Sequence, residues 1–432
     1  MNPRSRALSL PFFFLGSALG AGLFFASCSD AQAGSGSTAR PDSPVESYIA
    51  DAPLAGYQKE LLDLAFDTAS SFPRVPHLKN RSRAQEVVVQ ACFELDQPRR
   101  ALGYVQRIDN WLRGAGYADY ALYCARKGDT TSVQRHLDLA REVYEKTEKE
   151  EIQDWQRDRI RVTIAKTLRR LGRSEEAVKF ETDLVEVESI KVEAAKAALA
   201  GGEAFDEQLQ AVDAAAAVGN FDHLRSALET CVRLFDRFYE DPERRSQAEA
   251  KVKASWSKLP ITVRVDLVMD LAESALGHED RGKALELVQE AEAIMDAATW
   301  KPELRIPVMA RLAVLRHGAG DGEGARKGAE AALASFEAER DQIFDYERAE
   351  TLQPLAEAFR SLGDTAAAHG IYAKAVEESA LNPNRRPRAD DLTAICCSMA
   401  LHAVEPDAEL RARMLEIRSG LEGRWVGEPE KQ

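Results

Sequence analysis

Apolar and polar positions alternate with a helical period along most of this chain. Around Gly363, a small residue lies seven positions before the glycine, five after it and twelve after it, at Ala356, Ala368 and Ala375. A glycine at this point can end one helix in a left-handed conformation, and Asp364 can cap the helix that follows. The pattern therefore predicts two antiparallel helices that meet through small residues and are joined by a short turn.

The same pattern returns at a near-constant spacing. Gly320 has the complete set, with Ala313, Ala325 and Ala332, while Gly128 and Gly172 keep most of it. Gly219 keeps less, and Gly277 needs a turn two residues longer to bring Ala284 and Ala291 into phase. From Gly128 to Gly363, successive glycines of this set are 44, 47, 58, 43 and 43 residues apart. One helix pair repeated along an elongated array gives such a period.

These residues resemble the tetratricopeptide repeat, a paired-helix unit with small residues at the helix crossing. The matching positions are Ile164-Ala165, Leu171-Gly172, Glu176-Ala177-Val178, Leu355-Ala356, Gly363-Asp364 and Ala368. The resemblance spans residues 84–403 and implies an all-α, right-handed α-solenoid. Its period of about 43 residues exceeds the family's roughly 34, and the family's terminal proline does not recur at a regular offset. Pairs of the HEAT type, with periods of roughly 40 to 47, are the structural alternative.

Residues 1–27 are expected to be a signal peptide, because Arg4 and Arg6 precede an apolar run. Phe25-Ala26-Ser27-Cys28 is similar to a bacterial lipobox, which makes Cys28 the expected lipid attachment site and the membrane contact. Cleavage at Ala31-Gln32-Ala33 and an uncleaved anchor are the alternatives. Each of the three places the body of the protein outside the cytoplasm, in the periplasm or cell envelope.

The rest of the chain divides into three predicted parts. Residues 28–50 form a flexible tether rich in Gly, Ser and Pro. Helical repeats occupy residues 51–403, with a division into two halves expected at Gly201-Gly202. Residues 404–432 are expected to supply a capping helix and a tail, because a solenoid needs a polar end.

Composition supports an all-α protein and limits its partners. The 432 residues include 30% charged and 7% aromatic side chains, with a formal net charge of −14. Good helix formers dominate, and no alternating run predicts a sheet. Removing residues 1–27 leaves 55 basic and 71 acidic side chains, so nucleic acid is an unfavourable partner, as is amphipathic insertion into an anionic membrane surface.

No constellation in the sequence predicts catalysis, a cofactor or a metal. No two of the seven histidines are three to five residues apart. The glycine-rich stretch from Gly318 to Gly324 lacks phosphate-loop spacing and is expected to be a turn. The aromatic group Tyr117, Tyr120 and Tyr123 is expected to pack in the core, because Tyr117 and Tyr120 fall at positions that pack between helices in the resembled family. The neighbours Cys396 and Cys397 are expected to pack in a helix.

The resemblance also implies where a partner would bind. In the tetratricopeptide family, the concave groove is lined by first-helix positions that here include five cations: Arg126, Lys166, Arg169, Arg170 and Arg360. A basic groove would attract acidic peptide segments or a terminal carboxylate. The expected function is an exported, membrane-tethered scaffold that binds protein or peptide. A helical-repeat envelope enzyme acting on glycan or peptidoglycan is the alternative, and a glycan-binding lipoprotein is the second alternative.

Overall fold

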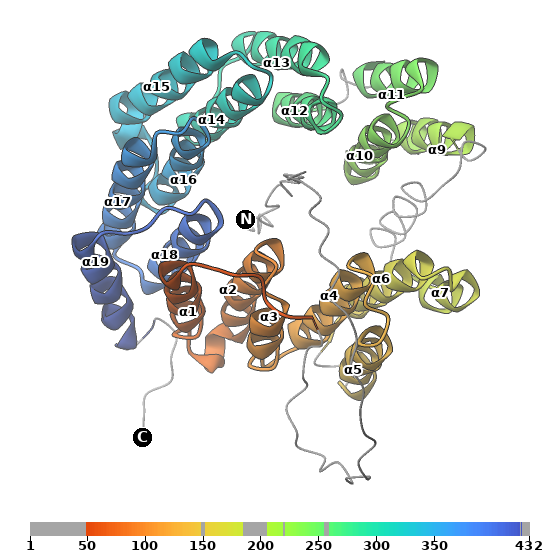
Figure 1. Cartoon of the computed structure of the whole chain (residues 1–432), viewed down its shortest axis with the longest axis horizontal. Coiled ribbons are helices and arrows are strands. Elements are labelled where there is room, and N and C mark those ends of the chain that lie inside the picture. The colour runs from red at the N-terminus through yellow and green to blue at the C-terminus, as the bar shows by residue number, and fades with distance from the viewer. Residues whose placement is uncertain are drawn as a thin grey trace, which may run out of the picture.

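The computed structural model describes residues 49–147, 152–184, 205–218, 221–254, 259–423 and 425. Within these ranges all regular secondary structure is helical. The helices follow one another along a curve, as Figure 1 shows. In chain order they are α1 (Gly56–Ala69), α2 (Arg74–Glu94), α3 (Pro98–Val105), α4 (Leu112–Arg126), α5 (Val133–Lys146), α6 (Asp154–Arg170), α7 (Ser174–Glu181), α9 (Phe205–Val218), α10 (Phe221–Arg237), α11 (Pro242–Ala254), α12 (Ile261–Gly277), α13 (Arg281–Asp296), α14 (Pro302–Gly318), α15 (Gly322–Glu339), α16 (Asp345–Ser361), α17 (Thr365–Leu381), α18 (Arg385–Leu401) and α19 (Ala408–Ser419).

Consecutive helices pack in pairs, as the sequence predicted. The pairs with the most extensive contacts are α16 with α17, α14 with α15, α12 with α13, and α4 with α5. In Figure 1, α12, α14, α16 and α18 lie on the inside of the curve, and α13, α15, α17 and α19 lie on the outside. The first helix of each of these pairs therefore supplies the inner surface.

The predicted turn glycines adopt the left-handed conformation that the pairing requires. Backbone φ angles are +80° at Gly128, +74° at Gly172, +92° at Gly320 and +82° at Gly363. The side chain of the residue after Gly320, Asp321, accepts a hydrogen bond from the backbone N–H of Gly324 at 2.9 Å and so caps α15. The stretch from Gly318 to Gly324 is thus the end of one helix and the start of the next.

Four left-handed residues in the described part of the chain are not glycine, and one of them is Asp183, with φ of +56°, after α7. In the turn after α12, the residue in the left-handed conformation is Glu279, with φ of +61°, two positions beyond Gly277. This shift puts Ala284 and Ala291 five and twelve positions after the turn, as the longer turn required. Asp96 and Ala403 take the same conformation after α2 and α18, with φ of +53° and +49°.

Small residues fill the helix crossings. Ala165 and Ala313 are each 1% exposed, and Ala356 is fully buried. The aromatic group on α4 also belongs to the core, since Tyr117 and Tyr123 are less than a tenth exposed and Tyr120 is inaccessible. Both observations confirm the packing roles that the repeat alignment gave these residues.

The two ends of the described chain meet. Helix α1 packs against α18, taking the place that the second helix has in the other pairs. Gln58 of α1 donates a buried hydrogen bond of 2.8 Å to the carbonyl oxygen of Ala400. Glu60 forms an ion pair with Arg411 of α19 at 2.6 Å. We call the contact of α1 and α2 with α18 and α19 the seam; one continuous apolar core runs through it.

The predicted capping segment, residues 404–432, begins with α19, which packs against α17 and α18. Leu421 and Trp425 continue from it onto Ala69 and Phe72 of the N-terminal part. The ring centroids of Phe72 and Trp425 are 4.8 Å apart. The far end of α19 is therefore covered by the N-terminal helices.

Several predicted features lie outside the described residues: the signal peptide, Cys28, the tether up to residue 48, Gly219 and the division at Gly201-Gly202. None of the described helices combines the length and the apolar composition needed to cross a bilayer. Cys92, Cys124, Cys231, Cys396 and Cys397 are all free and buried. Cys396 and Cys397 pack in α18, as expected.

Candidate functional site

Four of the five predicted groove cations lie on two neighbouring helices. Arg126 ends α4, and α6 carries Lys166, Arg169 and Arg170. Helices α4 and α6 pack against each other. Arg360 lies on α16, on the other side of the seam. The structure therefore brings together a basic group at the end of α4 and α6 and separates Arg360 from it.

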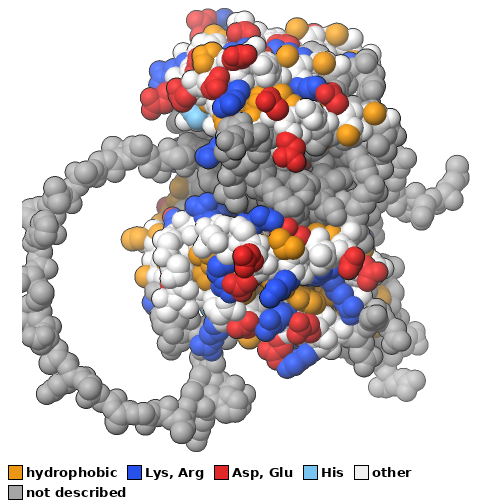
Figure 2. Space-filling view, turned by 90° about the vertical axis from the view of Figure 1, so that its right-hand side faces the viewer, with side chains coloured by type: hydrophobic (Ala, Val, Ile, Leu, Met, Phe, Trp, Pro, Cys, Tyr) orange, Lys and Arg blue, Asp and Glu red, His pale blue; other side chains and the backbone are white. Residues whose placement is uncertain are grey.

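Arg126 and Arg170 are the two exposed members of this group. Burial and, next, the positive charge of Arg170 lower the pKa of Arg126. Neither guanidinium forms a hydrogen bond or an ion pair with another residue in the part of the chain that the structure describes. Figure 2 shows Lys and Arg side chains gathered along the upper margin of the lower described block, which in Figure 1 contains α4 to α7.

The other predicted groove residues are engaged in the fold. Arg169 donates two hydrogen bonds of 2.6 Å to the carboxylate of Glu181. Arg360 donates to the carbonyl oxygen of His402 at 2.8 Å. Val162, which lies one helical turn before Lys166 on α6, is only 2% exposed. Arg126 and Arg170, with Lys166 beside them, are thus the part of the predicted groove that faces solvent.

Acidic side chains flank this basic group on its α2 side. Glu86 of α2 pairs with Arg159 of α6, and Asp119 of α4 accepts a hydrogen bond of 3.1 Å from Gln90. Burial raises the pKa of both carboxyls, and the charge of Arg159 opposes that rise. The inner surface therefore changes from partly buried acids to exposed cations within two helices.

A second polar cluster lies at the seam and contains a hydroxyl, an imidazole and a carboxylate. Ser398 donates to Oε1 of Glu357 at 2.7 Å, and the hydroxyl of Tyr372 lies 2.6 Å from the serine Oγ. The Nδ1 atom of His402 lies 3.0 Å from the backbone oxygen of Ser398 and 3.4 Å from its Oγ. These residues come from α16, α17 and α18.

The seam cluster lacks the geometry of a catalytic triad. The Ser398 hydroxyl donates to the Glu357 carboxylate rather than to the imidazole, and the serine is only 2% exposed. A backbone oxygen can only accept, so the short contact of His402 Nδ1 places the imidazole proton on that nitrogen. This proton leaves Nδ1 unable to accept the proton of the serine, and the cluster ties three helices together.

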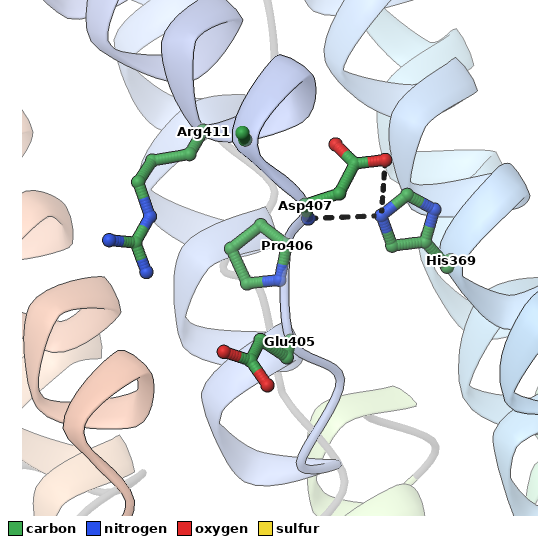
Figure 3. Close-up of a pocket in the computed structure, with 6 residues that line it drawn as sticks. His369, Glu405, Pro406, Asp407 and Arg411 are labelled. Atoms are coloured by element: carbon green, nitrogen blue, oxygen red, sulfur yellow. Dashed lines mark hydrogen bonds and ion pairs between the residues drawn. The ribbon is translucent and has the colours of Figure 1, made fainter.

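The structure also has an open depression of about 680 Å³ between α17 and the start of α19. Figure 3 shows its lining, with His369 pointing at Asp407 and Arg411 on the opposite side. The backbone N–H of Asp407 donates to Nε2 of His369 at 3.3 Å, and the Asp407 side chain caps α19 by accepting from Leu410 N at 2.8 Å. In this depression, His369 and Asp407 thus contact each other, while Arg411 pairs with Glu60 of α1.

Among the described residues, no group of three or more His, Cys, Asp or Glu side chains is placed to hold a metal ion. No protein-family model matches the chain, and no curated protein is significantly similar to it. The sequence pattern did not single out the depression or the seam cluster, because each is assembled from separate helices whose packing the pattern does not specify. The Asp caps at the start of α17 and α19 were the only local signal near them.

Proposed function

We propose that this protein is a binding scaffold for acidic segments of proteins or peptides, which it holds on the inner surface at α4 and α6. The observation that carries the proposal is the exposed pair Arg126 and Arg170, whose guanidinium groups form no hydrogen bond or ion pair with another described residue, although the charge of Asp119 acts on Arg126. Arg311 of the inner helix α14, by contrast, is paired with Asp270 and Glu273. Two exposed guanidinium groups offer bidentate hydrogen bonds to carboxylates.

We also propose a specific type of helical array. The chain is a TPR-like, right-handed α-solenoid in which each helix pair adds one step to the curve. The left-handed turns at Gly128, Gly172, Gly320 and Gly363 and the buried alanines at the crossings support it. In such arrays the inner helices present an extended concave surface, which suits a peptide better than a small molecule.

We further propose that the scaffold is non-catalytic and works outside the cytoplasm, held to a membrane by a lipid at Cys28. The apolar run before Cys28 and the Gly, Ser and Pro-rich tether after it support this location. Replacing Cys28 with alanine should abolish labelling by a radioactive fatty acid and release the protein into the soluble periplasmic fraction. A mature N-terminus at Gly34 would contradict the lipid anchor.

The binding claim is tested with a fluorescent polyglutamate peptide and the purified protein. Changing Arg126 and Arg170 together to glutamine should weaken binding about tenfold or more, because hydrogen bonds to charged groups contribute roughly 1.5 to 3 kcal/mol each. The dependence of affinity on salt should also become shallower. A matched control changes Arg135 and Arg237, which are exposed on other helices, to glutamine.

Equal affinity of the two double variants would contradict the proposal. Affinity capture from envelope extracts then identifies the natural ligand. A stoichiometric protein in the eluate supports the scaffold, whereas glycan cleavage by the eluate supports an envelope enzyme instead. Binding of glycan without cleavage would support the glycan-binding lipoprotein.

A further inference from the structure

The seam brings together three turns with an unusual charge balance. Each includes the residues that join two helices and the adjoining helix end: residues 70–81 run from the turn after α1 into α2, residues 106–113 from the turn after α3 into α4, and residues 381–388 from the last residue of α17 into α18. Together they hold eight cations and one acid, in a chain whose net charge is −14. The cations are Arg74, Lys79, Arg81, Arg107, Arg113, Arg385, Arg386 and Arg388, and the acid is Asp109. We call this surface the seam edge.

Side-chain contacts show that the three turns are neighbours. Arg74 pairs with Asp109 of the next turn at 3.0 Å. Phe72 of the first turn lies against Trp425, which follows α19, and Arg385 of the third turn donates to the carbonyl oxygen of Gly420 at 3.3 Å. The closure of α1 on α18 thus creates one surface from segments near opposite ends of the chain.

The positive charge on the seam edge is only partly compensated. Asp109 is shared by Arg74 and Arg81. Two acids just outside the three stretches, Asp67 and Asp390, pair with Arg107 at 3.6 Å and with Arg386 at 3.7 Å. Arg74 and Arg386 are 70% and 58% exposed at their side chains, and Lys79 and Arg113 are also exposed. Burial lowers the pKa of Arg81 and of Arg388, and neighbouring arginines on the same surface lower both further.

Apolar side chains project from the same turns. Val75 is 67% exposed and Leu381 is 62% exposed, the two highest values among the large apolar residues that the structure describes. Protein interfaces concentrate their binding energy in packed central clusters. Isolated apolar tips flanked by Arg and Lys are instead typical of proteins that rest on an anionic bilayer, where the tips enter the headgroup region and the cations attract the lipids.

We propose that the seam edge docks on the surface of a membrane containing anionic phospholipid. This inference goes beyond the proposed function, which concerns the inner surface at α4 and α6. The net charge of the whole chain predicts an unfavourable interaction with an anionic membrane, whereas the seam edge is expected to be attracted to one. The electric field at a surface depends on local charges within a Debye length of about 8 to 10 Å.

The geometry of the chain allows this contact together with a lipid at Cys28. The described chain starts at the opposite edge, where Ala52 N–H donates to the carbonyl oxygen of Asp96 at 2.8 Å. The 17 residues of α18 span about 25 Å from one edge to the other. The chain from Cys28 to Ile49 can extend about 65 Å, so it is long enough to return to the membrane.

The test uses the chain beginning at residue 29, which lacks only the predicted signal peptide and Cys28, all outside the described fold. We expect it to sediment with vesicles of phosphatidylglycerol and phosphatidylcholine at low salt, and not with phosphatidylcholine alone. Val75→Ser with Leu381→Ser should reduce the bound fraction several-fold, as should Arg74→Gln with Arg386→Gln. Circular dichroism and urea melts establish that each variant is folded.

The matched control is Val178→Ser with Leu415→Ser, which removes two exposed apolar side chains of α7 and α19. Its vesicle binding should equal that of the parent chain. The proposal is overturned if the parent chain does not bind anionic vesicles, or if the control loses as much binding as the seam variants. Binding of polyglutamate through Arg74 and Arg386 without vesicle binding would assign the edge to an acidic polypeptide instead.

Discussion

Gln58 in the first helix donates a buried hydrogen bond of 2.8 Å to the carbonyl oxygen of Ala400, 342 residues later in the chain. This contact joins helices that have no local relationship in the sequence. It lies within the core that includes Leu62 and Phe66 from the start of the chain and Cys397 and Met399 from the end. The seam is therefore as buried as the interior of a domain, and its closure contributes to the stability of the whole array.

Replacing Gln58 with leucine should lower the free energy of unfolding by about 1 to 3 kcal/mol, because a buried amide is lost and its partner carbonyl is left less satisfied. Urea melts followed by circular dichroism measure the change. Gln134→Leu is the matched control, since Gln134 is exposed and forms only surface hydrogen bonds, with Arg173 and Asp138. An equal decrease in the free energy of unfolding of the two variants would mean that the seam hydrogen bond contributes no more stability than a surface contact does.

Leucine in place of Ala313 or Ala356 should overpack a helix crossing and cost about 1 to 3 kcal/mol at each site. The methyl groups of these alanines are buried where paired helices meet. Ala331→Leu provides the control, because Ala331 is on the exposed face of α15. If the buried sites tolerate leucine as well as Ala331 does in urea melts, the assignment of the crossings is wrong.

The contribution of Asp391 of α18 to the free energy of unfolding should be less favourable at neutral pH than at acid pH. Burial and the nearby charges of Asp390 and Glu350 raise the pKa of Asp391 well above its usual value, and burial raises the pKa of Asp390 to about 6. A carboxyl whose pKa is higher in the folded state contributes stability that is fully present below its unfolded pKa. That contribution is lost as the pH rises through the folded pKa.

We therefore expect Asp391→Asn to be more stable than the parent protein at pH 8, by on the order of 1 kcal/mol. The difference should shrink as the pH falls through 6 towards 4. Urea midpoints at several pH values test this, with Asp206→Asn as an exposed control. A constant difference across the pH range would contradict the assigned ionisation.

Burial of the five described cysteines predicts slow reaction with a thiol reagent in the folded protein. Burial also raises the pKa of each of these thiols, which lowers the fraction of reactive thiolate. The residues should become reactive together with the loss of helical signal in urea. Rapid labelling of Cys92 or Cys397 in native conditions would show that the seam opens.

The sequence predicted the parts of the fold that are determined locally. Glycine at a turn and alanine at a crossing reflect backbone conformation and close packing, so Gly363 and Ala356 could be recognised from their spacing alone. The turns at Asp96, Glu279 and Ala403 were missed or misplaced because non-glycine residues adopt the left-handed conformation there. Asp280 still caps the helix after Glu279, so the cap was the better signal at that turn.

The seam could not be predicted because no local pattern specifies which distant helix will cover α1. Gln58 reads as an ordinary polar residue on a helix, and its partner is a backbone oxygen. For the same reason, the candidate site could be predicted only in part. Repeat spacing placed Arg126 and Arg170 correctly on adjacent helices, but the pairing of Arg169 with Glu181 depends on how α6 and α7 pack.

The packing of α1 against α18 holds the array that carries both proposed surfaces. The distance between the side chains of Glu60 and Arg411 is the most direct measure of this packing. Both side chains are partly exposed and form an ion pair across the seam. We predict that cysteines at these two positions are joined within one molecule by a short bismaleimide, and that cysteines at Glu60 and Lys301 are not. Peptide mass spectrometry identifies the joined residues. Efficient labelling of both cysteines of the first pair without a link between them, in the folded monomer, would contradict the account.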